Sequence, residues 1–224
     1  MRVAKEKSEG TRFSGGNFFT GKRRGRLLFE SMKAHVPARI FSRLASVLLA
    51  AVLLSQCTTC VVTNPDIVVV SVKDQKLGLY EKGVLKKQYK ISTSKFGLGS
   101  DSGSYKTPLG KLEVVRKIGD GLPAGAVLKG REWNGEVLTP NAPGRDPVVS
   151  RILCLSGKES GNRNTFKRCI YIHGTPEERT LGQPASYGCV RMGMKDVVTV
   201  FGEVPVGTTV LITESKLAPR AEFK

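Results

Sequence analysis

A histidine and a cysteine in the stretch YIHGTPEERTLGQPASYGCVRM have the residue types of a base and a nucleophile. His173 is the second of two histidines in the chain, and Cys189 follows it by sixteen residues. An imidazole can accept a thiol proton and later return it to a leaving amine. Arg191 could lower the thiol pKa through its positive charge or hold a substrate carboxylate. The alternative is that both are core residues, since buried free cysteines are common and inert.

The sequence around the histidine favours the chemical interpretation. The run CIYIHG has the β-branched and aromatic character of a strand, so alternate residues should face opposite sides. Cys169, Tyr171 and His173 then share one face, and His173 ends the strand where Gly174 opens a loop. A rigid strand end can present an imidazole to a cleft.

The sequence before the cysteine also favours a chemical role for the pair. Gly188 permits a tight turn that a residue with a Cβ would resist. Such a turn can expose the sulfur and aim the N–H groups of Gly188 and Cys189 at an oxyanion on the attacked carbonyl. No metal site is predicted, because the only C-x-x-C, Cys57 and Cys60, abuts an apolar run and lacks a second ligand pair.

The elements that must position these groups read as short strands separated by turns. The predicted strands are 67–72, 76–81, 84–92, 111–118, 148–155, 168–172 and 207–214. Residues 96–106 are rich in glycine and serine, which predicts a loop, and the closely spaced glycine and proline of 119–144 predict a long excursion with only short pieces of strand. Val197, Val200 and Phe201 have helical spacing. We therefore expect a mostly β fold with one short helix after the cysteine.

IHGT followed by SYGCVRM closely resembles the signature of the L,D-transpeptidase catalytic domain family, roughly H-G/S-T and then S-x-G-C-x-R/N. TPLGKLEV, residues 107–114, is similar to the family's TPxG turn and strand, and ISTS, residues 91–94, stands where the family often has VSTG. The resemblance covers residues 67–213. It implies a β-sandwich of mixed sheets with a short helix.

The resemblance also implies a role for each matching residue. Cys189 matches the nucleophile and His173 the general base, while the Gly174 carbonyl would orient the imidazole. The remaining matched motif positions are Ser186, Gly188 and Arg191, with the Gly188 and Cys189 amides as the implied oxyanion donors.

The main departure from the family pattern is Tyr187, where many members have a second histidine. His173 can still serve as the base, so the departure bears on substrate preference and on the thiol pKa. Residues 95–106 also form a longer segment than the family's usual loop before TPxG. Tyr105 and Trp133 lie in the predicted loops, where they either line a substrate groove or pack on the surface.

The resemblance implies an enzyme that acts on peptidoglycan stem peptides without a cofactor or metal. The thiolate would attack the L-centre carbonyl of the third stem residue and expel D-alanine. The thioester would pass to a second stem peptide, forming a 3-3 cross-link, or to a lysine of an envelope lipoprotein. Carbapenems would acylate the same thiol. An L,D-carboxypeptidase or amidase would use identical residues, and a non-catalytic wall-binding protein is a further alternative.

Residues 1–60 predict an export signal. They hold 11 Lys and Arg against 3 Asp and Glu, followed by an apolar run at 44–54. The run is too short to span a bilayer, which takes about 20 residues, but fits a secretory signal. Met32 offers an alternative start, and LLSQC loosely resembles a lipobox with Cys57 as the lipid-bearing residue. We therefore expect export to the periplasm or envelope, with membrane contact only through the signal or a lipid.

The chain then divides into residues 1–60, a linker at 61–66, a catalytic domain at 67–213 and a tail at 214–224.

The net charge of +17 suggests a nucleic-acid partner, but +8 of it lies in residues 1–60 and no pattern of basic and aromatic residues follows, so no nucleic-acid partner is predicted. Cys154 and Cys169 are candidate core residues, or a disulfide in an oxidising compartment.

Overall fold

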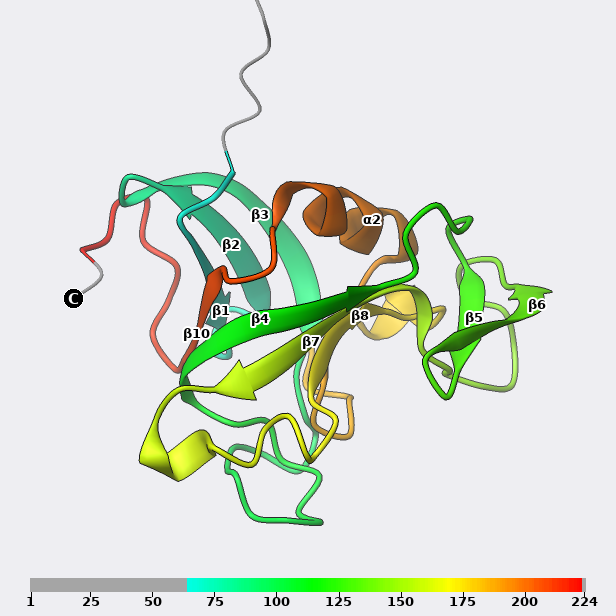
Figure 1. Cartoon of the computed structure of the whole chain (residues 1–224), viewed down its shortest axis with the longest axis horizontal. Coiled ribbons are helices and arrows are strands. Elements are labelled where there is room, and N and C mark those ends of the chain that lie inside the picture. The colour runs from blue at the N-terminus through cyan, green and yellow to red at the C-terminus, as the bar shows by residue number, and fades with distance from the viewer. Residues whose placement is uncertain (1–63, 223–224) are drawn as a thin grey trace, which may run out of the picture. The chain divides into compact units, whose positions relative to one another are not determined.

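Ten strands dominate the computed structural model, which describes residues 64–222 of the chain (Figure 1). The strands are β1 (Ile67–Ser71), β2 (Lys76–Glu81), β3 (Val84–Ser92), β4 (Gly110–Ile118), β5 (Ala126–Lys129), β6 (Glu132–Val137), β7 (Val149–Gly157), β8 (Tyr171–Gly174), β9 (Val190–Met192) and β10 (Thr209–Thr213). The α-helix is α2 (Met194–Glu203), and η1 (Ser160–Asn162) and η2 (Glu178–Thr180) are single 3-10 turns. The predicted export signal, Met32 and Cys57 lie outside the described residues. Within 64–222, no helix has the length and apolar character needed to cross a membrane.

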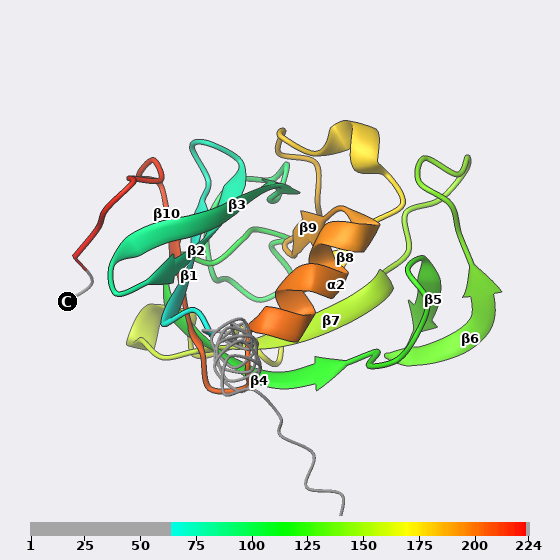
Figure 2. The same cartoon turned by 90° about the horizontal axis from the view of Figure 1, so that it is seen from above.

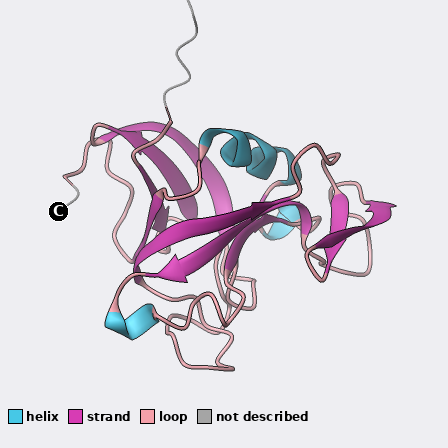
Figure 3. Cartoon of the chain, viewed as in Figure 1, coloured by secondary structure: helices cyan, strands magenta, loops and turns pink. Residues whose placement is uncertain are grey.

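The sheet closes on itself. Its strand order is β4–β10–β1–β2–β3–β9–β8–β7–β5–β6, and β4 also pairs with β7. This extra pairing produces a barrel-like arrangement from which the β5–β6 hairpin projects (Figures 1 and 2). Most neighbours are antiparallel, while β1–β10 and β8–β9 run parallel. The mostly β fold with one helix after the cysteine is confirmed (Figure 3), and the closure is compatible with the predicted β-sandwich.

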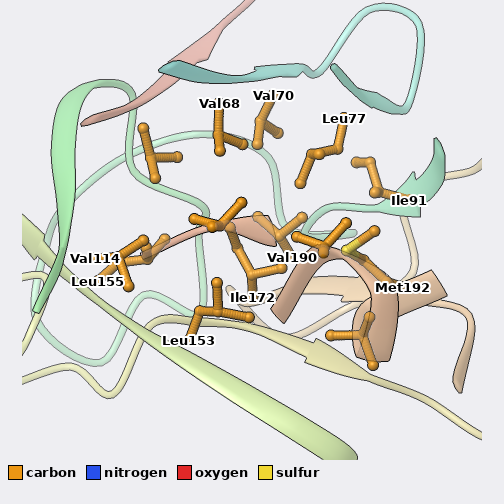
Figure 4. Packing of buried hydrophobic residues seen from close by; sticks show 14 of the residues in the cluster. Val68, Val70, Leu77, Ile91, Val114, Leu153, Leu155, Ile172, Val190 and Met192 are labelled. Atoms are coloured by element: carbon orange, nitrogen blue, oxygen red, sulfur yellow. The ribbon is translucent and has the colours of Figure 1, made fainter. Parts of the chain in front are cut away.

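Alternate strand residues face the interior and form the main core (Figure 4). Val68, Leu77, Ile91, Ile172 and Met192 come from five different strands and are each at most 1% exposed. Burying one such side chain contributes about 1.5–3 kcal/mol. Because two of these five residues belong to β8 and β9, the core fixes the strands that carry the candidate site.

Helix α2 begins two residues after β9 and packs against β7 and β8 (Figure 2). Its buried residues are Met194, Val197, Val200 and Phe201, as the helical spacing predicts. The Met194 amide donates to Glu178 Oε1 at 2.8 Å, so a carboxylate outside the helix caps its positive end. This bond ties the η2 segment to the helix.

The strand predicted at 168–172 lies too early in the sequence, since the observed strand β8 covers Tyr171–Gly174. The observed β8 begins at Tyr171, because Cys169 has a left-handed φ of 56° and its amide donates to the Phe166 carbonyl in a turn. Cys169 therefore does not share a strand face with Tyr171 and His173. The alternation within β8 is as predicted: Ile172 enters the main core, while Tyr171 packs in a separate cluster.

The segment predicted as a tail packs against the β2–β3 hairpin. Tyr80 donates its hydroxyl to the Ala218 carbonyl at 2.8 Å, and the Ala221 amide donates to Gly83 O at 2.8 Å. The Leu217 amide donates to a carboxylate oxygen of Asp74. Residues 214–221 thus extend the folded domain beyond β10.

Candidate active site

The predicted histidine and cysteine come together through the parallel pairing of β8 and β9. His173 lies opposite Arg191 in the register, and Cys189 directly precedes β9. A cavity of about 130 Å³ is lined by Asp146, Val148, His173, Ser186, Tyr187, Cys189 and Arg191. Five of the seven predicted site residues line it. The other two, Gly174 and Gly188, adjoin His173 and Cys189 and act through their backbones.

His173 is a buried, neutral imidazole with a defined tautomer. Its Nδ1 lies 2.8 Å from the Gly174 carbonyl oxygen, the contact predicted for Gly174. A carbonyl can only accept, so Nδ1 carries the hydrogen and Nε2 keeps its lone pair. Burial lowers the His173 pKa, while the Gly174 bond and Asp146 act in the opposite direction. The ring is therefore able to accept a proton at neutral pH.

The Cys189 thiol is protonated and half-buried. It donates to the Cys169 carbonyl at 3.4 Å and accepts from the Tyr171 amide at 3.4 Å. Burial raises its pKa to about 11, although the Tyr171 amide and Arg168 favour the thiolate. A nearby positive charge therefore does favour the thiolate, as predicted, but it comes from Arg168, and burial outweighs it so that the net shift of the thiol pKa is upward. A thiol and a neutral imidazole, rather than a thiolate–imidazolium pair, form the resting site.

The turn before the cysteine is built from side-chain to backbone bonds. Gly188 has a φ of 118°, and a Cβ there would lie 3.1 Å from Ile170 Cδ1. Ser186 Oγ donates to the Cys189 carbonyl at 2.6 Å and accepts from the Gly188 amide at 3.2 Å, while Thr107 donates to the Gly188 carbonyl. Because the Gly188 amide already donates to Ser186, the Cys189 amide is the stronger of the two predicted oxyanion donors.

The Arg191 side chain is bonded to other residues of the protein. Its guanidinium is bonded to Asp146, to Ser92 Oγ at 3.2 Å and to Thr180 Oγ1 at 2.9 Å. The residue is 5% exposed, so it holds the cavity wall together and is not free to bind a carboxylate in this arrangement. Asp146 also accepts from the Thr175 hydroxyl, two residues after His173.

Sequence reasoning missed Asp146. It lies in the Gly- and Pro-rich connection between β6 and β7, and no spacing relates it to the His-Cys motif. Its carboxylate raises the pKa of His173 while Arg191 lowers it, so the two charges oppose each other at the imidazole. Only the folded chain reveals this pair.

The remaining candidates fall into two groups. Tyr187 and Tyr105 lie at the rim, where Tyr187 is 60% exposed and its hydroxyl accepts from Lys95 at 2.9 Å. Trp133 lies on β6, donates to the Glu136 carbonyl and does not line the catalytic cavity. The three described cysteines are free: Cys154 is buried as predicted for a core residue, whereas Cys169 is exposed, so the core prediction for Cys169 and the alternative Cys154–Cys169 disulfide are both wrong. Within 64–222 no group of three or more potential ligands could hold a metal ion.

Comparison with known proteins gives consistent matches. The model of the L,D-transpeptidase catalytic domain family matches residues 65–212. "Putative L,D-transpeptidase YkuD" of Bacillus licheniformis is 30% identical over 156 residues, which are 68% of this chain and 70% of that protein. "Putative L,D-transpeptidase YqjB" of Bacillus subtilis is 46% identical over 52 residues, 23% of this chain and 30% of that protein.

Among solved structures, an L,D-transpeptidase from Mycobacterium smegmatis aligns with a TM-score of 0.42 and 15% identity, covering 66% of this chain and 58% of that chain. An Enterococcus faecium L,D-transpeptidase aligns with a TM-score of 0.43 and 19% identity, covering 67% and 50%. The chain therefore spans less than two thirds of several of the proteins it matches.

Proposed function

Because the chain belongs to the L,D-transpeptidase catalytic domain family, we propose that it is a cysteine acyltransferase that acts on peptidoglycan stem peptides. One observation carries the proposal: the Cys189 thiol and a neutral imidazole with a free Nε2 line the same small cavity. Their types and protonation states suit acyl transfer through a thioester. No other described residue in that cavity is an equivalent nucleophile, since Ser186 is committed to the turn.

In the proposed first half-reaction, Cys189 Sγ attacks the carbonyl at the L-centre of the third stem residue while its proton passes to His173 Nε2. The raised thiol pKa favours transfer that accompanies the attack, because little thiolate exists beforehand. The Cys189 amide would donate to the oxyanion. Collapse of the tetrahedral adduct breaks the amide bond, and His173 returns the proton to the departing D-alanine amine.

In the second half-reaction, an amine of a second stem peptide attacks the thioester and displaces the thiol. The product is then a 3-3 cross-link. If the attacking amine is instead a lysine of an envelope lipoprotein, the product is that lipoprotein attached to the stem peptide. Water as the acceptor gives an L,D-carboxypeptidase. The same residues serve all three outcomes, so the acceptor is decided by what reaches the thioester.

The proposal includes export to the periplasm or cell envelope, because the substrate lies there. The basic and apolar segments within residues 1–60 support it, with lipidation at Cys57 as one form of anchoring. Fractionation of cells that express the tagged chain tests this part. Recovery in the cytosol alone would contradict it.

The activity is tested with the full chain and disaccharide tetrapeptide, with products followed by mass spectrometry. Wild type should release D-alanine and Cys189→Ala should not, while Cys169→Ala is the matched control because it removes a thiol but keeps the backbone carbonyl that contacts Cys189. A 3-3 dimer identifies a transpeptidase, and tripeptide alone identifies a carboxypeptidase. If folded, reduced wild type leaves the substrate unchanged, the proposed activity is wrong.

A further inference from the structure

Three exposed aromatic rings lie together at the rim of the catalytic cavity. Phe96, Tyr105 and Tyr187 are 44%, 58% and 60% exposed. Their ring centroids are 5.3–5.9 Å apart, and the planes are tilted or perpendicular. Single exposed rings are ordinary, whereas a contiguous group beside a cavity marks a binding surface. We refer to these three residues as the aromatic patch.

The segment that carries Phe96 and Tyr105 is held in place by partly buried polar contacts. The Arg168 guanidinium donates to the carbonyls of Gly99 at 3.2 Å and Lys106 at 2.6 Å. Ser94 Oγ donates to the Tyr105 carbonyl at 2.5 Å. The rings are therefore presented by a fixed backbone, which reduces the entropy lost when a ligand binds.

The patch is continuous with the catalytic cavity. Tyr187 lines that cavity and also a neighbouring one of about 250 Å³. The second cavity is lined by Ser102, Gly103, Tyr105, Asn164, Lys167, Arg168, Ile170 and Tyr187. A ligand whose reacting carbonyl lies beside Cys189 therefore reaches the patch without leaving the protein surface.

Polar groups surround the ring faces. The Lys95 ammonium lies 4.3 Å from the Tyr187 ring centroid and donates to its hydroxyl, and Tyr105 contributes a second phenol. A purely aliphatic ligand would leave these donors and acceptors unpaired, and an ammonium ligand would meet the positive charge of Lys95. A pyranose ring fits both features, because its C–H faces pack on aromatic rings and its hydroxyl and acetamido groups hydrogen-bond at the edge.

We propose that the aromatic patch binds an N-acetylhexosamine ring of the glycan to which the donor stem peptide is attached. This inference rests on the proposed function and deepens it, since it names a second part of the substrate that the same site recognises. Phe96 and Tyr105 are then specificity-determining residues that act on substrate binding, remote from the reacting atoms.

The test compares two donors, disaccharide tetrapeptide and the same tetrapeptide without sugar, using the full chain. Wild type should favour the sugar-bearing donor in kcat/KM. Phe96→Ala should lower kcat/KM for that donor about fivefold, chiefly through KM, the effect expected for one lost ring contact. Its kcat/KM for the sugar-free donor should change less than twofold. Trp133→Ala, which removes a ring of similar exposure on β6, should affect neither.

Equal losses on both donors would overturn the inference, because the patch would then contact the peptide or only support the fold. Unchanged values for both donors would overturn it as well. Peptide-free disaccharide, titrated into wild type and Phe96→Ala and followed by NMR, gives a result that does not depend on turnover. Weaker binding to the variant supports the patch even if no D-alanine is released, while absence of binding to wild type overturns it.

Discussion

The inner wall and the outer rim of the catalytic cavity are built in opposite ways. On the inner wall, His173 and Arg191 are each 5% exposed and hydrogen-bonded to backbone or side chains of neighbouring strands and loops. On the rim, Phe96, Tyr105 and Tyr187 expose about half of their surface and touch mainly one another and Lys95. The wall holds the proposed reacting groups in place, and the rim is exposed where the proposed substrate would lie.

This difference indicates where substitutions should act. A change in the wall leaves a buried polar group unpaired or moves a reacting atom, which is costly. A change in the rim removes a contact that only a bound ligand completes. Four predictions test the wall side of the comparison, and each would weaken it if a change near the reacting groups had no larger effect than its control.

The largest effect is expected for His173→Asn. Asparagine keeps a donor near the position of Nδ1 for the Gly174 carbonyl but provides no base, so kcat for D-alanine release should fall about 10²–10⁴-fold. Thermal unfolding of the variant serves as the control for folding. A fall of less than about tenfold in a folded variant would show that His173 is not the base.

Asp146→Asn should lower the free energy of unfolding by about 2 kcal/mol, because the buried Arg191 guanidinium then loses a charge-assisted hydrogen bond to a partly exposed carboxylate. The matched control is Glu136→Gln, which breaks the exposed pair with Arg145 and should cost under about 1 kcal/mol. Urea unfolding curves provide both values. Equal losses would mean that the Arg191–Asp146 pair, in which the arginine is buried, contributes no more than a surface pair.

The reactivity of Cys189 should follow its raised pKa. Burial raises this pKa to about 11 from about 9, so below pH 9 the thiolate fraction is about a hundredfold smaller than for an unperturbed thiol. The greater nucleophilicity of a more basic thiolate offsets about tenfold of this. Iodoacetamide should therefore alkylate Cys189 about tenfold more slowly at pH 7, with the rate still increasing above pH 9.

This alkylation is measured by intact-mass spectrometry in the Cys169→Ala background, so that the exposed thiol does not contribute. A small-molecule thiol of pKa about 9 provides the reference rate. A rate that reaches its plateau below pH 8 would contradict the protonated resting thiol and would restore the thiolate–imidazolium alternative.

The smallest effect is expected from a pair of glycines. Gly188→Ala should cost about 1–2 kcal/mol of unfolding free energy and lower activity, because φ is 118° and the new Cβ would approach Ile170. Gly202→Ala lies on an exposed position of α2 with open space around it and should stabilise by about 0.5 kcal/mol. Similar effects of both would show that the turn before Cys189 does not need glycine.

Local patterns predicted much of the fold. β2 and β3 have the predicted bounds, and the helix lies after the cysteine, where the apolar spacing predicts it. These elements were predictable because the alternation of a strand and the spacing of a helix each extend over only a few residues. The start of β8 was mispredicted because Cys169 adopts a left-handed φ inside a run with strand composition. Turn bonds from residues 164–169 decide that conformation, and composition does not encode them.

The sequence by itself predicted the proposed reacting groups, since His173, Gly174, Ser186, Gly188 and Cys189 match the motif positions of the family that the chain resembles. Only the tertiary structure decided their protonation and surroundings. Burial sets the pKa directions of the thiol and the imidazole, and Asp146 and Phe96 reach the site from loops distant in sequence. Burial and long-range contacts arise when the sheet closes, so no local pattern contains them.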